Sequence, residues 1–366
     1  MQRPATALLA RTAFAGAALA GSALLLARAV RRRPPIRFRD RVAVVTGGSR
    51  GLGLLMAREL VKAGARVALL ARDADELDLA RRELAALGGQ RVLALPCDVR
   101  DEDEVRWAID AVAERFGRLD ILINNAGIIQ VGPLEHMTVD DFNEAMRTHF
   151  WGPLHATLAA LPHLRQQETG RIVNIASIGG RISVPHLLPY SASKFALVGL
   201  SDGLRSELAR EKIYVTTVTP GLMRTGSHVN AQFKGKRDEE LAWFAISDSL
   251  PLASMAGRRA AKRILEACRY GEPSLTLTPQ AKAAAIANVA APNLTARLME
   301  LAVRLLPGAA AEDGEENRPG WQSSSRWVPS VLTRLSDRAA VENNELLGAA
   351  AAYGQEGEGR EGSRSS

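Results

Sequence analysis

The sequence predicts an α/β fold, a doubly wound parallel sheet (Rossmann-like) of about seven strands with helices on both faces. Three observations support this prediction. Short apolar runs rich in Val and Ile recur along the chain, helical patterns separate them, and a glycine-rich turn follows the first run directly. Strands buried on both faces of a parallel sheet read as continuous apolar runs, so the alternation favours this architecture.

The predicted strands can be placed one by one. The apolar runs lie at 41–46, 66–71, 91–95, 120–124, 171–176, 213–219 and 274–278. A helix is expected between the second and third runs, with an apolar stripe of Leu77, Ala80, Leu84 and Leu87. Gly88 and Gly89 end this helix, because glycine stops helices readily.

Composition divides the chain into four regions. They are an apolar and basic N-terminal segment (1–38), the α/β domain (39–280), C-terminal apolar helices (281–307) and a polar tail (308–366). One or two helices are expected in the third region, with a break at Pro292. The tail is rich in Gly, Glu, Ser and Asn, which bury little apolar surface. We expect it to be mostly disordered, with a short helix near 329–349.

Charge and composition exclude several classes of function. The chain has 47 basic and 40 acidic residues, but nine arginines and one acidic residue lie before residue 42. The remaining chain is nearly neutral, so the folded body is not expected to bind nucleic acid. Cys97 and Cys268 alone cannot form a disulfide framework and favour a reducing compartment. The histidines lack the spacing of a metal site, and no metal is expected.

The N-terminal segment contains an uncharged apolar run at 12–27, bounded by Arg11 and Arg28. The run is shorter than the roughly 20 residues that span a bilayer, but flanking arginine side chains can extend toward the headgroups. More arginines follow the run than precede it, which predicts a membrane anchor with the following domain on the cytoplasmic side. A cleaved secretory signal, with residues 27–29 as its cleavage site, is the alternative.

The turn after the first strand has the features of a dinucleotide-binding loop. Its residues are Thr46, Gly47, Ser49, Arg50, Gly51, Leu52 and Gly53. Glycines allow backbone amides to approach a pyrophosphate, and the dipole of the following helix favours negative charge there. The spacing is G-x-x-x-G-x-G rather than the commoner G-x-G-x-x-G. A purely structural turn is the alternative, but the position between strand and helix favours cofactor binding.

The end of the second strand bears on the choice of cofactor. Ala71 occupies the position where an acidic residue would bind a ribose 2′-hydroxyl, and Arg72 follows it. Arg72 and Arg50 could instead bind a 2′-phosphate through paired hydrogen bonds. NADP is therefore predicted over NAD. The alternative is that Arg72 pairs with Asp73 or Asp75 in solvent.

Three residues form a candidate catalytic set. Ser177 ends the fifth predicted strand, and Tyr190 and Lys194 lie four residues apart on one face of a helix. A neighbouring ammonium group favours the phenolate, so we expect Lys194 to lower the pKa of Tyr190 toward the working range of an acid or base. Tyr and Lys at this spacing are common on exposed helices, so the pair gains weight only from its neighbours in the sequence.

In this order the motifs resemble those of the short-chain dehydrogenase/reductase family over residues 39–280. The resemblance implies hydride transfer between nicotinamide and a carbonyl or alcohol carbon, with Tyr190 as general acid in reduction and base in oxidation. Ser177 would hold the substrate oxygen, and Lys194 would also bind the nicotinamide ribose. The remaining cofactor contacts implied by the resemblance are Asp98, Val99, Asn125, Ala126, Gly127, Pro220, Gly221 and Thr225.

His149 stands where members of this family usually carry an Asn that positions a water beside the Lys. Because histidine titrates near neutrality, a proton relay through His149 is one hypothesis. The alternative is a helix histidine whose ring is satisfied by a backbone carbonyl oxygen.

The stretch 222–256 is long enough to form a lid, and Trp243 and Phe244 give it an apolar character. The predicted function is therefore NADP-dependent interconversion of a lipophilic ketone or aldehyde and its alcohol. A catalytically silent nucleotide-binding interaction protein on the same fold is the alternative. By resemblance, a homodimer or homotetramer formed through the helices at 139–166 and 190–211 is expected, unless the helices at 281–306 cover that surface or dock on lipid.

Overall fold

The computed structural model describes residues 35–88, 91–251, 254–310, 314–323 and 325–346. Seven parallel strands form one sheet in the order β11-β7-β6-β4-β1-β2-β3. The strands are β1 (Val42–Thr46), β2 (Arg66–Ala71), β3 (Val92–Pro96), β4 (Ile121–Asn124), β6 (Gly170–Ile175), β7 (Ile213–Thr219) and β11 (Ser274–Thr276). The predicted doubly wound sheet is confirmed, with each predicted run within two residues of a strand at either end.

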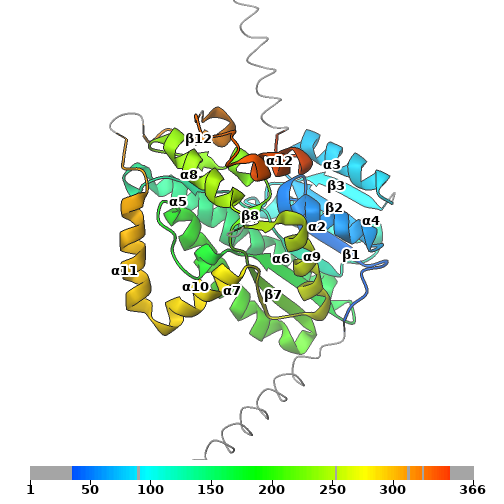
Figure 1. The fold of residues 1–366 in the computed structure, drawn as a ribbon. Helices are drawn as coiled ribbons and strands as arrows, with labels where there is room; N and C mark the ends of the chain where they lie inside the picture. Colours follow the sequence, from blue (N-terminus) through cyan, green and yellow to red (C-terminus); the bar gives the residue numbers. More distant parts are fainter. Residues whose placement is uncertain (1–34, 89–90, 252–253, 311–313, 324, 347–366) are drawn as a thin grey trace, which may run out of the picture.

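Helices cover both faces of the sheet (Figure 1). One face packs against α2 (Gly51–Lys62), α3 (Ala74–Ala86) and α9 (Gly257–Tyr270). The other packs against α4 (Glu102–Phe116), α6 (Gly152–Arg165) and α7 (Leu188–Glu207). Val45 points into the first of these two cores and Val44 into the second, as expected for a strand buried on both sides.

Smaller elements connect these strands and helices. They are α5 (Val139–Met146), a π-helix (Arg147–Trp151), α8 (Arg237–Ser249), β5 (Gln130–Val131), β8 (Met223–Arg224), β9 (Gln232–Phe233) and β10 (Met255–Ala256). The chain continues into α10 (Pro279–Ala290) and α11 (Pro292–Ala302), with the predicted break between them. Several apolar side chains of these two helices are exposed, including Ile286, Val289, Leu294 and Leu298.

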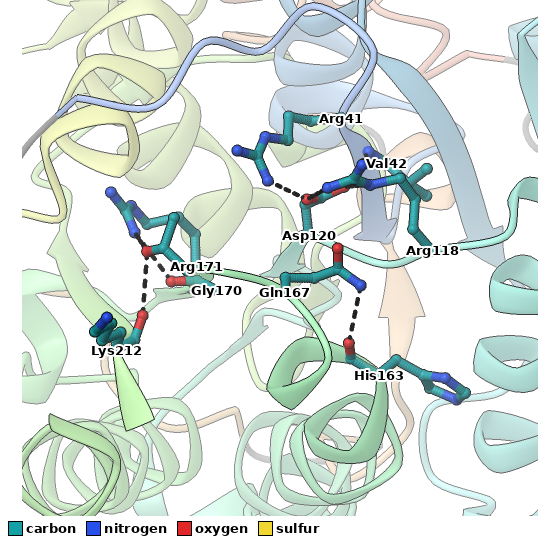
Figure 2. Close-up of polar contacts among 10 residues, drawn as sticks. Arg41, Val42, Arg118, Asp120, His163, Gln167, Gly170, Arg171 and Lys212 are labelled. Carbon is teal, nitrogen blue, oxygen red and sulfur yellow. Dashed lines mark hydrogen bonds and ion pairs between the residues drawn. The ribbon is translucent and has the colours of Figure 1, made fainter. Parts of the chain in front are cut away.

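Polar contacts gather around Asp120 at the amino ends of β1 and β4 (Figure 2). Asp120, just before β4, accepts hydrogen bonds from Arg41 at 2.6 Å and Arg118 at 2.6 Å. The backbone N–H of Val42 also donates to Asp120, at 2.9 Å, and so ties β1 to β4. The Asp120 side chain is therefore buried together with charge partners.

The expectation of a mostly disordered tail was wrong for its described part. Residues 314–323 and 325–346 pack on the body and contain β12 (Arg318–Pro319) and α12 (Arg334–Glu342), the latter near the predicted short helix. Ala339 and Ala340 are 9% and 1% exposed, and Gly226 lies against Ala340. The composition is polar, but docking against the body supplies burial and hydrogen bonds that the tail alone lacks. We call residues 334–346 the C-terminal strap.

The predicted anchor at 12–27 lies outside the described residues. Within the described part of the chain, every helix is too short or too polar to cross a bilayer.

Candidate active site

A cleft of about 740 Å³ opens at the carboxyl ends of the strands. Its wall combines the glycine turn, the ends of β2 and β4, the start of α7, the loop after β7 and helix α8. In open α/β sheets this edge is where ligands bind, because the loops leave a crevice there. The topology therefore brings together motifs that are far apart in the sequence.

The glycine turn has the backbone geometry that the motif predicts. Gly47 and Gly51 have positive φ values of 61° and 56°, a region that favours glycine. A Cβ on Gly53 would collide with the carbonyl oxygen of Gly47, so the helix can start this close to the strand only with glycine. Gly47, Ser49, Arg50, Gly51 and Leu52 line the cleft.

Hydrogen bonds of the Thr46 and Asn125 side chains fix the glycine turn to the end of β4. The Thr46 hydroxyl accepts the backbone N–H groups of Asn125 at 3.0 Å and Ala126 at 3.1 Å. The Asn125 side chain donates to the carbonyl oxygens of Thr46 and Gly47, both at 3.0 Å. Asn125, Ala126 and Gly127 line the cleft, while Thr46 and Gly53 lie beneath its wall. Thr46 and Gly53 therefore shape the turn rather than face a ligand.

Arg50 is already paired in this structure. Its guanidinium group lies 2.6 Å from Glu76 and 3.5 Å from Glu345. Glu76 is 4% exposed and also accepts from the Ser49 hydroxyl at 2.9 Å. A cofactor phosphate would have to share this guanidinium group with two carboxylates, which weakens the role predicted for Arg50.

Arg72 differs from Arg50 in being exposed at the cleft edge. It has no hydrogen-bond or ion-pair partner among the described residues, so the alternative pairing with Asp73 or Asp75 does not form there. Asp98 lines the adjoining wall and is paired with Arg100 at 2.6 Å; Val99 follows it. Arg72 is thus the available cation beside the predicted 2′-phosphate position.

Ser177 and Tyr190 meet on the opposite wall. The two side chains are close enough for Ser177 to lower the pKa of the Tyr190 phenol, and the Ser177 oxygen accepts the backbone N–H of Gly179 at 3.1 Å. Both residues line the same cleft as the glycine turn. A donor and an acceptor hydroxyl are therefore presented side by side to that space, as substrate oxygen binding requires.

Lys194 lies beneath Tyr190. Its Nζ atom is 5.5 Å from the centre of the Tyr190 ring and donates to the carbonyl oxygen of Ile175 at 2.9 Å. The side chain is buried and has no acidic partner among the described residues. Burial lowers the pKa of Lys194 to about 7. Its other two N–H groups can serve hydroxyl groups in the cleft.

The expectation that Lys194 lowers the pKa of Tyr190 is not met. Burial raises the pKa of Tyr190 above its ordinary value, the hydrogen bond from Ser177 opposes this, and the nearby charge of Asp248 adds to it. Desolvation also disfavours the charge of Lys194 and so weakens its pull on the phenol. Tyr190 is accordingly protonated at neutral pH, the state that donates a proton.

His149 lies in the π-helix and is fully buried. Its Nε2 atom accepts the backbone N–H of Ile128 at 3.1 Å, and its Nδ1 atom lies 2.8 Å from the Ser193 hydroxyl, which donates to the carbonyl oxygen of Tyr190. Burial and then the charge of Lys194 hold the pKa of His149 well below its ordinary value. The ring is thus satisfied, but by a backbone N–H and a hydroxyl group rather than by the expected backbone carbonyl oxygen. The relay stays a prediction.

The loop after β7 closes the far side of the cleft. The Pro220 carbonyl oxygen accepts the backbone N–H of Ile178 at 2.7 Å, which joins this loop to the Ser177 turn. Gly221 packs against Thr278, where a Cβ would lie 2.5 Å from the hydroxyl oxygen. Pro220, Gly221 and Thr225 all line the cleft, as the resemblance implies.

The wall beside Tyr190 is apolar with one buried carboxylate. Val184, Leu187, Trp243 and Phe244 line this part of the cleft. Asp248, one turn beyond Phe244 on α8, lines it too and is 5% exposed. It has no hydrogen-bond or ion-pair partner among the described residues, and burial raises its pKa to about 7. Such a group is costly unless a ligand satisfies it.

Sequence reasoning missed three acidic residues of the cleft. Glu76 carries a local signal, because an Asp followed three residues later by a Glu is typical of a helix N-terminus. In the structure the Asp73 side chain accepts the backbone N–H of Glu76. Asp248 and Glu345 carry no such local signal. They reach the cleft through the docking of α8 and of the C-terminal strap.

The residues present fit a nicotinamide dinucleotide. The glycine-rich turn at the start of α2 can provide backbone donors for a pyrophosphate. Buried Lys194, bonded to a single carbonyl oxygen, provides donors for ribose hydroxyls. When bound, the nicotinamide would supply or accept hydride, and the protein groups would orient the reactants and move the proton.

Comparisons with known proteins agree with this geometry. Residues 41–234 match the short chain dehydrogenase family. An Anopheles gambiae dehydrogenase/reductase SDR family protein 7-like is 33% identical over 75% of this chain and 86% of its own. An Arabidopsis thaliana 11-beta-hydroxysteroid dehydrogenase-like 3 is 39% identical over 50% of this chain and 60% of its own.

A solved structure from Sinorhizobium meliloti, described as a short-chain alcohol dehydrogenase, is also similar. It superposes with a TM-score of 0.60 at 29% identity, over 68% of this chain and 99% of its own. Together with the parallel sheet and the Ser177, Tyr190 and Lys194 cluster, these matches identify an oxidoreductase that uses NAD(P). The chain belongs to the short-chain dehydrogenase/reductase family.

Proposed function

We propose that the protein interconverts a lipophilic ketone or aldehyde and its alcohol, with NADPH as the preferred cofactor. The observation that carries the proposal is the meeting of the Tyr190 and Ser177 hydroxyls, above buried Lys194, in the cleft that also contains the glycine turn. Ser177 orients the substrate oxygen, and the protonated phenol of Tyr190 donates to it in reduction.

The substrate class follows from the wall beside Tyr190. Val184, Leu187, Trp243 and Phe244 offer apolar contact, and Asp248 offers a single buried acceptor. A mostly apolar substrate with one hydroxyl or amino group would satisfy both features. The similarity to a hydroxysteroid dehydrogenase-like relative supports the same class.

The cofactor preference rests on the end of β2. Ala71 lacks the carboxylate that would bind a 2′-hydroxyl, and Arg72 is available at the cleft edge. Arg50 supports NADPH less than the sequence implies, because Glu76 holds it at 2.6 Å.

Substitution Tyr190→Phe tests the proposal. It removes the proton donor and keeps the ring, so NADPH consumption with a panel of hydrophobic carbonyls should fall by roughly 10²- to 10⁴-fold. Binding of NADPH, measured by calorimetry, should be little changed. Tyr270→Phe is the matched control, since Tyr270 is 40% exposed and lies outside the cleft wall.

The same experiment separates the two functional classes. Tight NADPH binding without turnover of any carbonyl, in native protein and variant alike, would favour a silent nucleotide-binding interaction protein and overturn the proposal.

A further inference from the structure

The C-terminal strap lies across the cofactor end of the cleft. In Figure 1, α12 (red) sits close to the start of α2 (blue), although the two are nearly 300 residues apart in sequence. The strap begins well beyond the region that matches the family, which ends at residue 234. Its Glu345 side chain nevertheless lines the cleft beside the glycine turn and is 5% exposed.

Hydrogen bonds fasten the strap to both sides of the cleft. On the α2 side, the backbone N–H of Gly51 donates to the Asn343 carbonyl oxygen at 2.9 Å, and Arg58 donates to the Asn343 side chain at 3.2 Å. On the other side, the Asn343 side chain donates to the carbonyl oxygen of Thr225 at 3.1 Å. Asn230 donates to the Glu345 carboxylate at 2.7 Å. The strap therefore bridges two walls that a bound dinucleotide would also contact.

The Glu345 carboxylate lies against the first residue of α2 and beside Arg50. A Cβ on Gly51, the first residue of α2, would lie 2.5 Å from its Oε1 atom, and its Oε2 atom is 3.5 Å from Arg50 Nε. Backbone N–H groups and the helix dipole make this end of α2 attractive to negative charge. In this structure a side chain of the protein supplies that charge.

A second anion cannot join Glu345 there at low cost. Glu76 already faces the same guanidinium group of Arg50, so the pocket holds two carboxylates for one cation. Burial raises the pKa of Glu345 above its ordinary value, while the charge of Arg50 and the hydrogen bond from Asn230 oppose this shift. The addition of a pyrophosphate would place like charges together in a desolvated site.

We propose that Glu345 is a determinant of cofactor affinity, because its carboxylate holds the anion position of the glycine turn in the free enzyme and has to leave when the dinucleotide binds. The strap then shifts away from Gly51. This inference uses the NAD(P) dependence of the family and is independent of the substrate class and of the preference for NADPH.

Substitution Glu345→Gln in the full chain tests the inference. It removes the charge and retains the size of the side chain, so the dissociation constants of NADPH and NADH should both fall, by roughly tenfold. Glu342→Gln is the matched control, because Glu342 lies on the same strap but pairs with exposed Arg338 at 2.8 Å. Unchanged or weaker binding by Glu345→Gln would overturn the inference, as would equal tightening by both variants.

Hydrogen exchange gives a second readout that needs no variant. Saturating NADPH should speed exchange of the strap amides while protecting the glycine turn, since the strap leaves as the cofactor enters. Slower exchange in the strap would show that it closes over the cofactor instead, and would overturn the inference.

Discussion

Two buried aspartates lie at opposite ends of the sheet, and they differ in whether the fold supplies partners for their carboxylates. Asp120 lies at the amino ends of the strands and is 1% exposed, with two arginines and a backbone N–H around its carboxylate (Figure 2). Asp248 lies in the cleft at the carboxyl ends and is 5% exposed, without a partner among the described residues. The two side chains are similarly buried, but only Asp120 has positively charged partners.

The pKa values of the two groups differ in direction for this reason. Burial alone would raise the pKa of Asp120, but hydrogen bonds from Arg118, Val42 and Arg41 outweigh it and lower the pKa. For Asp248 burial acts unopposed. Asp120 is thus satisfied by the fold, whereas Asp248 is left for a ligand to satisfy.

The largest expected effect is at Asp120. Asp120→Asn removes the charge that two arginines share, so the free energy of unfolding at pH 7 should fall by about 3 kcal/mol. Because the folded pKa is lowered, this stabilisation is present above the unfolded pKa of roughly 4 and is lost as pH falls through the folded value. Urea unfolding at pH 7 and pH 3 measures it. An equal loss at both pH values would contradict the charge explanation.

A change of opposite sign is expected at Asp248. Asp248→Asn removes a carboxylate whose ionisation opposes folding, so the free energy of unfolding at pH 8 should rise by about 2 to 3 kcal/mol. The folded pKa is raised to about 7, so the penalty is absent below roughly pH 4 and grows as pH rises toward 7.

Urea unfolding at pH 4 and pH 8 checks this sign. Asp202→Asn serves as control, because that side chain is 46% exposed and pairs with Arg205. A loss of stability at pH 8 in Asp248→Asn would show that the carboxylate has a partner in the native protein.

The smallest effect concerns the cofactor end of the cleft. Arg72→Ala removes the cation available to a 2′-phosphate, so the preference for NADPH over NADH should fall by roughly tenfold, with NADH binding almost unchanged. Dissociation constants for both cofactors measure this. Arg81→Ala, at an exposed arginine of α3 paired with Asp78, is the control. An unchanged ratio would remove the main support for NADPH.

Much of the fold was predictable from local patterns. Apolar runs such as 66–71 and 213–219 coincide with β2 and β7, because a strand buried on both faces must be apolar along its length. The glycine turn was equally predictable, because glycine is required by the local backbone. Gly47 has a positive φ, and a Cβ on Gly53 would collide with the carbonyl oxygen of Gly47. Ser177, Tyr190 and Lys194 were found by their order in the chain, and the structure brings them together.

Other features depended on contacts between distant segments. The pKa of Tyr190 was expected to fall, but burial beside Asp248 raises it. Arg50 was expected to be available to a phosphate, but Glu76 and Glu345 pair with it. The tail after residue 308 was expected to be mostly disordered, but its strap docks on Gly51 and Thr225.

The sequence by itself determined which functional groups occur and in what order along the chain. They are a glycine turn for a dinucleotide, then a serine, a tyrosine and a lysine. Each of these signals lies within one strand, turn or helix, where spacing alone dictates geometry. Only the tertiary structure decided the charges around the cleft, because Glu76, Asp248 and Glu345 come from separate elements. Their effect depends on desolvation and on which cation lies within reach, and both are properties of the packed molecule.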